Sequence, residues 1–131
     1  MKVQKLIRNE QGFTLVEIIA VLIILGILAA VAVPRYIDLE ANAKDRAIDA
    51  GISELNGRES LTWADQKISS SGWVDDAKTL GAVDTFLGAD YVWDGGDLPD
   101  ASGGTLAFKN GAGIVLTRTI STTTQPGLWA R

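Results

Sequence analysis

The chain has 131 residues and a formal net charge of −4, and it contains neither cysteine nor histidine. That length allows one membrane-spanning helix and one small domain, and it excludes a multidomain enzyme. Without Cys and His there are no disulfides, thiolate nucleophiles, Cys/His zinc sites or histidine acid–base groups. An acidic surface also repels phosphate, which argues against a nucleic-acid partner. We therefore expect a non-enzymatic protein stabilised by its helix, its sheet or neighbouring chains.

Residues 1–12 form a short basic leader. Its positive residues are Lys2, Lys5 and Arg8. Cations ahead of an apolar segment favour the cytoplasmic side of a membrane, so we expect the C-terminal portion of the chain to cross to the outside. The leader contributes +2, so a chain that began at Phe13 would carry a side-chain net charge of −6.

An apolar run occupies residues 13–33 and is interrupted only by Thr14 and Glu17. As a helix it would extend about 32 Å, close to the roughly 30 Å hydrocarbon thickness of a bilayer. A carboxylate inside a membrane costs on the order of 2.5 to 3.5 kcal/mol and usually has a partner. Cleavage between Gly12 and Phe13 would create an α-amino group about 6 Å of helix rise from Glu17. We therefore predict assembly through this helix, with Glu17 paired to such an amine on the same or a neighbouring chain.

Two positions in this region are unfavourable for a helix. Gly26 has low helix propensity, and Pro34 lacks a backbone donor and clashes with the carbonyl four residues earlier. We expect the helix to kink or loosen between Gly26 and Pro34. Gly26 could also serve as a small-residue contact between packed helices.

A charged segment with helical periodicity follows Pro34 and should end between Trp63 and Ile68. Glu40 and Lys44 form an attractive i,i+4 pair within it. Apolar residues recur at spacings near three and four, which predicts an amphipathic helix; they are Ile37, Ala41, Ala47, Ile48, Ile52 and Leu55. A second short helix or ordered connector is expected within residues 73–87.

Strands and turns are expected after Gly88. The strands are predicted at residues 91–93, 105–109 and 114–120, and the Asn-Gly sequence at 110–111 is typical of a hairpin turn. The expected buried face of the sheet comprises Leu106, Phe108 and Val115, with Leu128 and Trp129 as further candidates. The predicted fold class is α+β, with a long N-terminal helical spine, transmembrane in its first half, packed on a small antiparallel sheet.

The basic leader, the junction Gly12-Phe13-Thr14-Leu15-Val16-Glu17 and the apolar stretch that closes at Pro34 cover about a quarter of the chain. In combination they resemble the type IV pilin superfamily, which includes type IV pilins and type II secretion pseudopilins. The resemblance implies a prepilin leader at residues 1–12, a transmembrane assembly helix at 13–34 and an extracytoplasmic head at 35–131.

The resemblance also implies a processing and assembly route. A membrane aspartyl prepilin peptidase would cut after Gly12, and Phe13 would then be N-methylated. Glu17 would pair with the N-terminal amine of an adjacent subunit, and the segment from Gly26 to Pro34 would lose helicity in the filament. The expected partners are identical subunits, the inner membrane, the peptidase and the assembly machinery. The product would be a surface pilus or, alternatively, a periplasmic pseudopilus that drives protein export.

The chain departs from many pilins because it has no cysteine and hence no C-terminal disulfide loop. Major secretion pseudopilins share this lack and can bind calcium between strands, which makes Asp94, Asp97 and Asp100 calcium candidates. Their spacing fits no calcium motif, and carboxylates in a Gly/Pro-rich loop are common in plain turns. We therefore expect no cofactor and keep calcium as the alternative.

Two other interpretations of the apolar run remain. Ala30-Val31-Ala32 resembles a signal peptidase site, and cleavage there would release a soluble secreted binding module. The run is longer than a usual signal core and contains an acid, which argues against that interpretation. The second is a single-pass anchor whose Glu17 lies near the membrane interface. Sequencing the mature N-terminus separates the first from a prepilin, because a prepilin begins at Phe13 and the secreted module at Val33.

Overall fold

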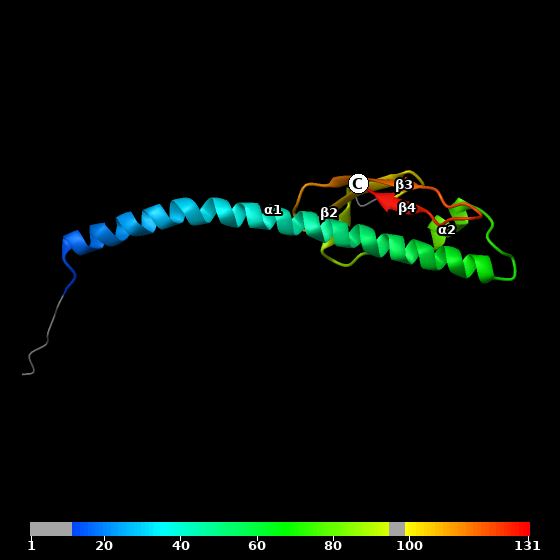
Figure 1. The fold of residues 1–131 in the computed structure, drawn as a ribbon, viewed down its shortest axis with the longest axis horizontal. Helices are drawn as coiled ribbons and strands as arrows, with labels where there is room; N and C mark the ends of the chain where they lie inside the picture. Colours follow the sequence, from blue (N-terminus) through cyan, green and yellow to red (C-terminus); the bar gives the residue numbers. More distant parts are fainter. Residues whose placement is uncertain (1–11, 95–98) are drawn as a thin grey trace, which may run out of the picture. The chain divides into compact units, whose positions relative to one another are not determined.

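The computed structural model describes residues 12–94 and 99–131. The chain divides into two compact units, residues 1–39 and residues 40–131. A long helix and a small antiparallel sheet confirm the α+β class predicted from the sequence. The elements, in chain order, are α1 (Leu15–Ile68), α2 (Asp76–Ala82), β1 (Tyr91–Trp93), β2 (Gly103–Phe108), β3 (Ile114–Thr119) and β4 (Leu128–Ala130) (Figure 1).

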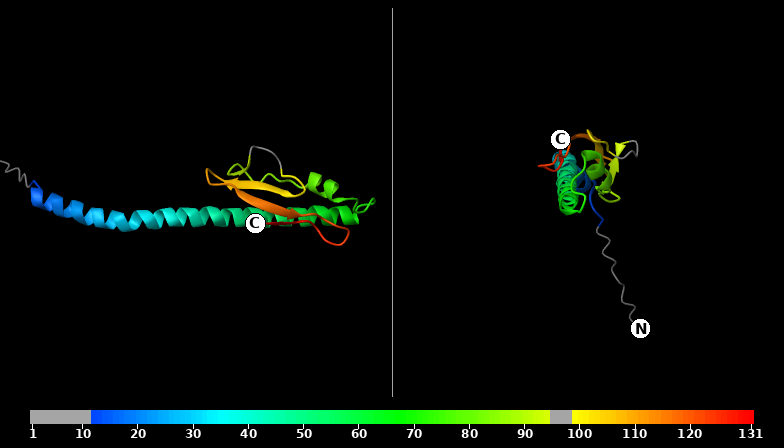
Figure 2. Two further views of the ribbon diagram at one scale, coloured as in Figure 1. Left: turned by 90° about the horizontal axis from the view of Figure 1, so that it is seen from above. Right: turned by 90° about the vertical axis from the view of Figure 1, so that its right-hand side faces the viewer.

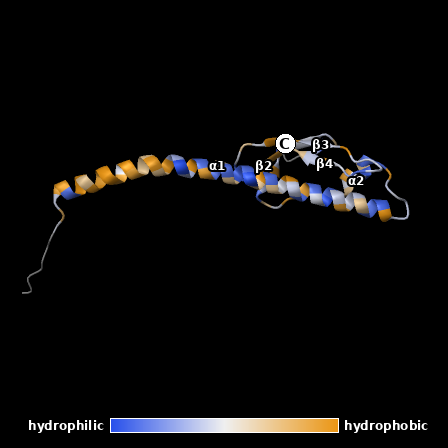
Figure 3. Ribbon diagram, in the orientation of Figure 1, coloured by the Kyte–Doolittle hydropathy of each residue, from blue (hydrophilic) through white to orange (hydrophobic). Residues whose placement is uncertain are grey.

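The first unit, as far as it is described, consists of the junction at residues 12–14 and the N-terminal part of α1. Figure 3 shows this part of α1 as almost continuously hydrophobic, and every described residue up to Leu39 is exposed. It is long and apolar enough to cross a membrane. A helix that is apolar on all sides needs to be buried in lipid or against other chains.

Helix α1 continues through both Gly26 and Pro34. An added Cβ at Gly26 would meet nothing within 4 Å, so a neighbouring helix could approach the backbone closely there. Pro34 supplies no N–H to the carbonyl of Ala30. The isolated chain therefore keeps a helical backbone across this segment, and its loosening in a filament stays a prediction.

The C-terminal end of α1 falls at Ile68, inside the predicted window. Ser69 donates its hydroxyl to the carbonyl of Gln66 at 2.7 Å, and Gly72 turns the chain with a φ of 67°. Within the helix, the predicted pair of Glu40 and Lys44 forms with a 2.8 Å separation between Oε1 and Nζ.

The short helix α2 lies within the segment where the sequence predicted a helix or connector. Asp75 is its N-cap and accepts a hydrogen bond from the Lys78 amide at 2.7 Å. Gln66, near the end of α1, donates to the Lys78 carbonyl at 3.1 Å and accepts from the Thr79 hydroxyl at 3.0 Å. These bonds hold α2 against the last turns of α1.

The four strands form one antiparallel sheet in the order β1-β2-β3-β4. Leu106 pairs with Ile114, so Ile114 and Leu116 share its face and the intervening Val115 faces the opposite side. Val115 is 68% exposed and Leu128 is 57% exposed, whereas Leu116 and Trp129 are buried. The prediction for Val115 was wrong because the alternation of β3 is opposite to the one assumed. Neighbouring strand residues face opposite sides, so only one of Leu128 and Trp129 can be buried; Trp129 is confirmed and Leu128 was wrong.

The core lies between the C-terminal part of α1 and the inner face of the sheet, and Figure 2 shows the strands running alongside that helix. Its buried members are Ile48, Leu55, Leu106, Leu116 and Trp129. Gly51 allows the close packing, since a Cβ there would lie 3.0 Å from Cε1 of Tyr91 and 3.3 Å from Cδ1 of Leu87. The amphipathic helix and the sheet thus stabilise each other by burying apolar surface.

The outer edge of β4 is covered by a side chain of α1. Asn56 accepts a hydrogen bond from the Trp129 amide at 2.7 Å and donates to the Trp129 carbonyl at 3.0 Å. Both backbone groups that Trp129 turns away from β3 are therefore satisfied by one amide side chain. This arrangement protects an edge strand that could otherwise pair with another chain.

A buried ion cluster centred on Arg118 fastens the C-terminal strands to both helices. The guanidinium binds the carboxylate of Glu59 on α1, with Nε at 3.0 Å from Oε2 and Nη2 on Oε1. It also binds Asp76 on α2 at 2.7 and 2.9 Å. Glu59 further accepts the indole N–H of Trp129 at 2.6 Å, and Asp76 accepts two bonds from Ser121.

The cluster changes the protonation equilibria of its members. Hydrogen bonds from Arg118 lower the pKa of Asp76 from 3.8 to about 2, with help from Ser121 and against the effect of partial burial. Burial alone would lower the pKa of Arg118, but Asp76 and Glu59 together raise it above its usual range. In a chain without disulfides, this cluster ties the end of the sheet to α1 and α2.

Candidate assembly site

Helix α1 begins with a capping box formed by Thr14 and Glu17. Thr14 is the N-cap, since its carbonyl accepts the first helical hydrogen bond from Ile18 at 3.2 Å. Its hydroxyl oxygen accepts the Glu17 amide at 3.2 Å. In return, Glu17 Oε2 accepts the Thr14 amide at 2.8 Å and the Thr14 hydroxyl at 2.7 Å. This reciprocal pattern fixes the Glu17 side chain over the first turn.

Both Thr14 donors reach the same carboxylate oxygen. Among the described residues, Oε1 of Glu17 has no hydrogen-bond donor. The negative charge lies in the first turn of α1, where the helix dipole favours it. The carboxylate is thus held in one orientation by its own chain while one oxygen can still accept a cation.

Thr14 is the member of this site that the sequence analysis does not single out. From composition alone it is only a polar interruption of the apolar run. The signal was present in Thr14-Leu15-Val16-Glu17, because Ser or Thr followed three residues later by Glu before an apolar run is the signature of a capping box.

The junction that precedes the helix is open. Gly12 and Phe13 have no regular secondary structure, Phe13 is 83% exposed, and a Cβ at Gly12 would meet nothing within 4 Å. The rest of the predicted leader, residues 1–11, lies outside the described part of the chain. The peptide bond between Gly12 and Phe13 therefore lies in accessible, non-helical backbone next to the capping box.

An exposed apolar surface extends along α1 beyond the capping box. Its large members are Leu15, Val16, Ile18, Ile19, Val21, Leu22, Ile23, Ile24, Leu25, Ile27, Leu28, Val31 and Val33. Contiguous apolar surface of this extent marks a membrane or protein interaction site. It can be buried in lipid or against copies of the same helix.

Asp94 and Asp100, the two calcium candidates that the structure describes, do not belong to a ligand cluster among the described residues. Asp100 accepts hydrogen bonds from the Ser102 hydroxyl at 2.6 Å and the Ser102 amide at 2.7 Å. These bonds lower the pKa of Asp100 below its usual value and close the turn before β2. Asp94 is exposed after β1, and Asp97 lies outside the described residues. Within the described residues, no group of three or more acidic, His or Cys side chains could hold a metal ion.

Comparison with known proteins agrees with this arrangement. Residues 7–33 match the family model of the prokaryotic N-terminal methylation motif. The type IV narrow pilus major component PilA5 of Thermus thermophilus is 50% identical over 42 residues, which cover 32% of this chain and 36% of that protein. The type IV major pilin protein PilA of Myxococcus xanthus is 36% identical over 55 residues, covering 42% of this chain and 25% of that protein. In these two relatives the match spans well under two thirds of their length.

A third relative matches along most of both chains. Fimbrial protein Q of Moraxella bovis is 31% identical over 125 residues, which cover 83% of this chain and 78% of that protein. No solved structure matches the chain. The methylation motif lies over the capping box and the apolar helix, and the long match extends the similarity into the head. The chain belongs to the type IV pilin superfamily.

Proposed function

We propose that this chain is the precursor of a structural subunit that polymerises into a type IV pilus-like filament through its N-terminal hydrophobic helix. The observation that carries the proposal is the Glu17 carboxylate, held by Thr14 in the first turn of a helix with an exposed apolar surface. An anion placed there needs a cation once the helix is buried. A helix of this kind has no evident use in a soluble enzyme.

Processing would supply that cation. A prepilin peptidase cuts between Gly12 and Phe13, and N-methylation of Phe13 leaves its amine positively charged. The new amine lies one residue before Thr14 in its own chain. The amine of an adjacent subunit then binds Oε1 of Glu17. Thr14 bonds only the other oxygen, and no other described residue donates to Oε1.

The pairing would set the axial register of the filament. Packing among identical helices keeps their apolar surfaces from water after they leave the membrane. That packing alone is non-directional, so it permits many axial offsets. A buried carboxylate without a partner costs several kcal/mol, which disfavours every offset except the one that brings amine and carboxylate together.

Before assembly, residues 13–34 would hold the precursor in the inner membrane with the leader in the cytoplasm and the head in the periplasm. The basic leader supports this orientation. Loss of helicity between Gly26 and Pro34, where helix propensity is low, would let the helix adapt to the filament. The partners are identical subunits, the prepilin peptidase and the assembly machinery.

A secretion pseudopilus is the alternative use of the same assembly chemistry. The relatives named above are described as pilus or fimbrial proteins, and this favours a surface pilus. Deleting the gene and scoring surface filaments beside secreted enzymes separates the two. Loss of filaments with normal secretion supports a pilus, whereas loss of secretion supports a pseudopilus.

Two substitutions at Glu17 test the proposal. Glu17→Ala removes both the capping interaction and the charge, whereas Glu17→Gln keeps an acceptor suitable for the capping box and removes only the charge. We expect both variants to insert and to lose the leader normally, and both to fail in filament assembly. Sheared filaments are quantified beside the membrane-bound mature subunit.

The glutamine variant gives the sharper result. If Glu17 serves only to cap the helix, Glu17→Gln assembles like the unaltered chain and only Glu17→Ala is defective. Normal filament yield from Glu17→Gln would therefore contradict the proposed pairing with the amine.

A further inference from the structure

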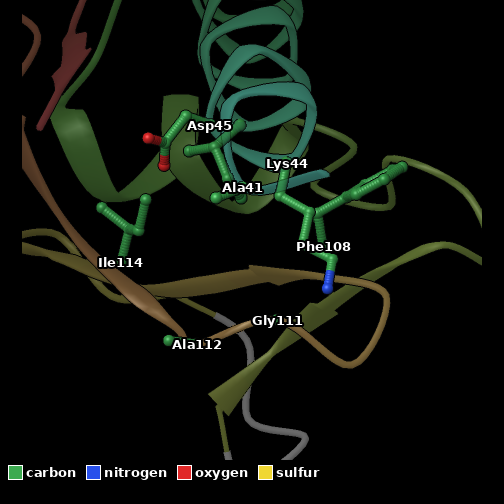
Figure 4. A pocket seen from close by; sticks show the side chains of 8 residues that line it. Ala41, Lys44, Asp45, Phe108, Gly111, Ala112 and Ile114 are labelled. Carbon is green, nitrogen blue, oxygen red and sulfur yellow. The ribbon is translucent and has the colours of Figure 1, made fainter. Parts of the chain in front are cut away.

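A small pocket lies at one end of the head, between α1 and the turn that joins β2 to β3. Figure 4 shows it bounded by the helix on one side and the hairpin on the other. Its volume is about 230 Å³, below the roughly 300 to 1,000 Å³ typical of small-molecule sites. The lining residues are Ala41, Lys44, Asp45, Ile48, Phe108, Gly111, Ala112 and Ile114. The pocket therefore suits one apolar side chain better than a separate ligand.

The rim of the pocket carries an acid that is available for a contact. Lys44 is paired with Glu40 at 2.8 Å. Asp45 is exposed, and among the described residues its carboxylate has no hydrogen bond or ion pair. Ala41 and Ala112 contribute little bulk, so the mouth stays open. A partner that placed an apolar side chain in the pocket and a cation beside it would match this end of the head.

The opposite end of the head offers those two features. Ile68, the last residue of α1, is 84% exposed. Lys78 lies beside the end of α1, because its carbonyl accepts the Gln66 amide at 3.1 Å. Its ammonium group has no hydrogen bond or ion pair among the described residues. At 1.5 Å per residue, Ile68 lies about 36 Å along α1 from Lys44.

We propose that the pocket receives Ile68 of a second copy of this chain, with Asp45 opposite Lys78 of that copy. This contact rests on the proposed filament function and would join the heads of two subunits. The contact joins different surfaces of two identical subunits, and a contact of this heterologous kind extends into a filament when it does not close into a ring. The acidic heads repel each other in most orientations. The attraction between Asp45 and Lys78 favours the one orientation in which these two residues face each other.

Disulfide trapping tests the contact directly, because the native chain has no cysteine. Filaments carrying Ile68→Cys together with Ala112→Cys are oxidised and separated under non-reducing conditions. We expect a ladder of covalent dimers, trimers and longer products, and only monomers from each single variant. Ile68→Cys with Val115→Cys is the matched control, since Val115 is exposed like Ala112 but lies on the outer sheet face, and it should give no ladder.

Charge reversal tests the same contact without relying on disulfide geometry. Asp45→Lys and Lys78→Asp should each lower the equilibrium constant for subunit association about fivefold per contact. The double variant restores the attraction in reversed polarity, so filament yield should recover. Glu54→Lys serves as a control, because Glu54 is paired with Arg58 away from the pocket.

The outcomes distinguish this inference from the proposed function. Filaments that form from the double-cysteine variant without a ladder, or with a ladder as strong in the control, overturn the head contact and leave the filament function intact. If the double-cysteine variant does not assemble, the charge-reversal experiment decides. The head contact is overturned if the double charge variant fails to restore filaments. Absence of any filament from the native chain overturns the proposed function itself.

Discussion

At the first turn of α1, the Glu17 carboxylate serves two interactions with its two oxygens. Oε2 accepts both Thr14 donors within the chain, and Oε1 is available to the amine of a neighbouring subunit. The two roles are compatible because they use different oxygens. In the proposed filament, Thr14 positions the Glu17 side chain, and Glu17 makes the contact with the neighbouring subunit.

Replacing Thr14 by valine preserves the shape of the side chain and removes its hydroxyl. The loss of an N-cap of this kind costs about 1 kcal/mol, so the first turn of α1 should open about fivefold more often. Amide hydrogen exchange of the mature subunit in detergent micelles measures this opening. Thr14→Ser is the control and should exchange at the native rate. Unchanged exchange in Thr14→Val would show that the capping box contributes nothing.

Asp76 makes the stability of the head depend on pH. Its pKa is about 2 in the folded chain against 3.8 ordinarily, so its contribution is complete above about pH 4 and is lost as the pH falls through about 2. The difference corresponds to on the order of 2 kcal/mol. Denaturant unfolding of the detergent-solubilised chain, followed by tryptophan fluorescence, should show this decline. Asp76→Asn should be less stable at pH 7 and should lack that part of the pH dependence.

At the scale of elements, β3 and β4 are held to the helices by charges rather than by a disulfide. Arg118→Met would leave the Glu59 carboxylate buried without its cation, which costs about 3 to 5 kcal/mol. Lys44→Met removes one partner of the exposed pair with Glu40 and should cost less than about 1 kcal/mol. Chemical denaturation of both variants gives the comparison. Equal losses would mean that the buried cluster does not fasten the sheet.

Periodicity and turn chemistry predicted most elements but not their attachment. The end of α1, the region of α2 and three strands followed from the spacing of apolar residues and from Gly and Asn at turns. Strand β4 has only three residues, too few for a clear alternation. Its buried Trp129 depends on Asn56, which is 73 positions away in the sequence, and such pairing leaves no local pattern.

The buried cluster shows the same limit. Alternation along β3 places Arg118 on the face of Leu116, but only the tertiary structure brings Glu59 from α1 and Asp76 from α2 to it. At the candidate assembly site, the sequence predicts roles for Gly12, Phe13 and Glu17 because their chemistry is local, and these roles stay predictions. Thr14 could also have been found there, since its partner lies three residues away.

In the whole molecule, the two units have different proposed tasks. The N-terminal unit carries the apolar surface and the carboxylate, and the head carries the proposed contact between Ile68 and the pocket beside Asp45. Both proposed contacts join unlike surfaces of identical subunits, as growth of a filament requires. They involve different neighbours, because the amine pairing needs an axial offset of about 6 Å and the head contact one of about 36 Å. The head contact can fail while the helix contact persists, so the two are separable by experiment.

The central claim is that the cation for Glu17 is created when the chain is cut between Gly12 and Phe13. Intact mass measurement of the subunit in purified filaments, combined with N-terminal sequencing, tests it most directly. We predict a chain that begins at Phe13 and carries one added methyl group. Filaments built from subunits that keep residues 1–12, or that begin at Val33, would contradict it.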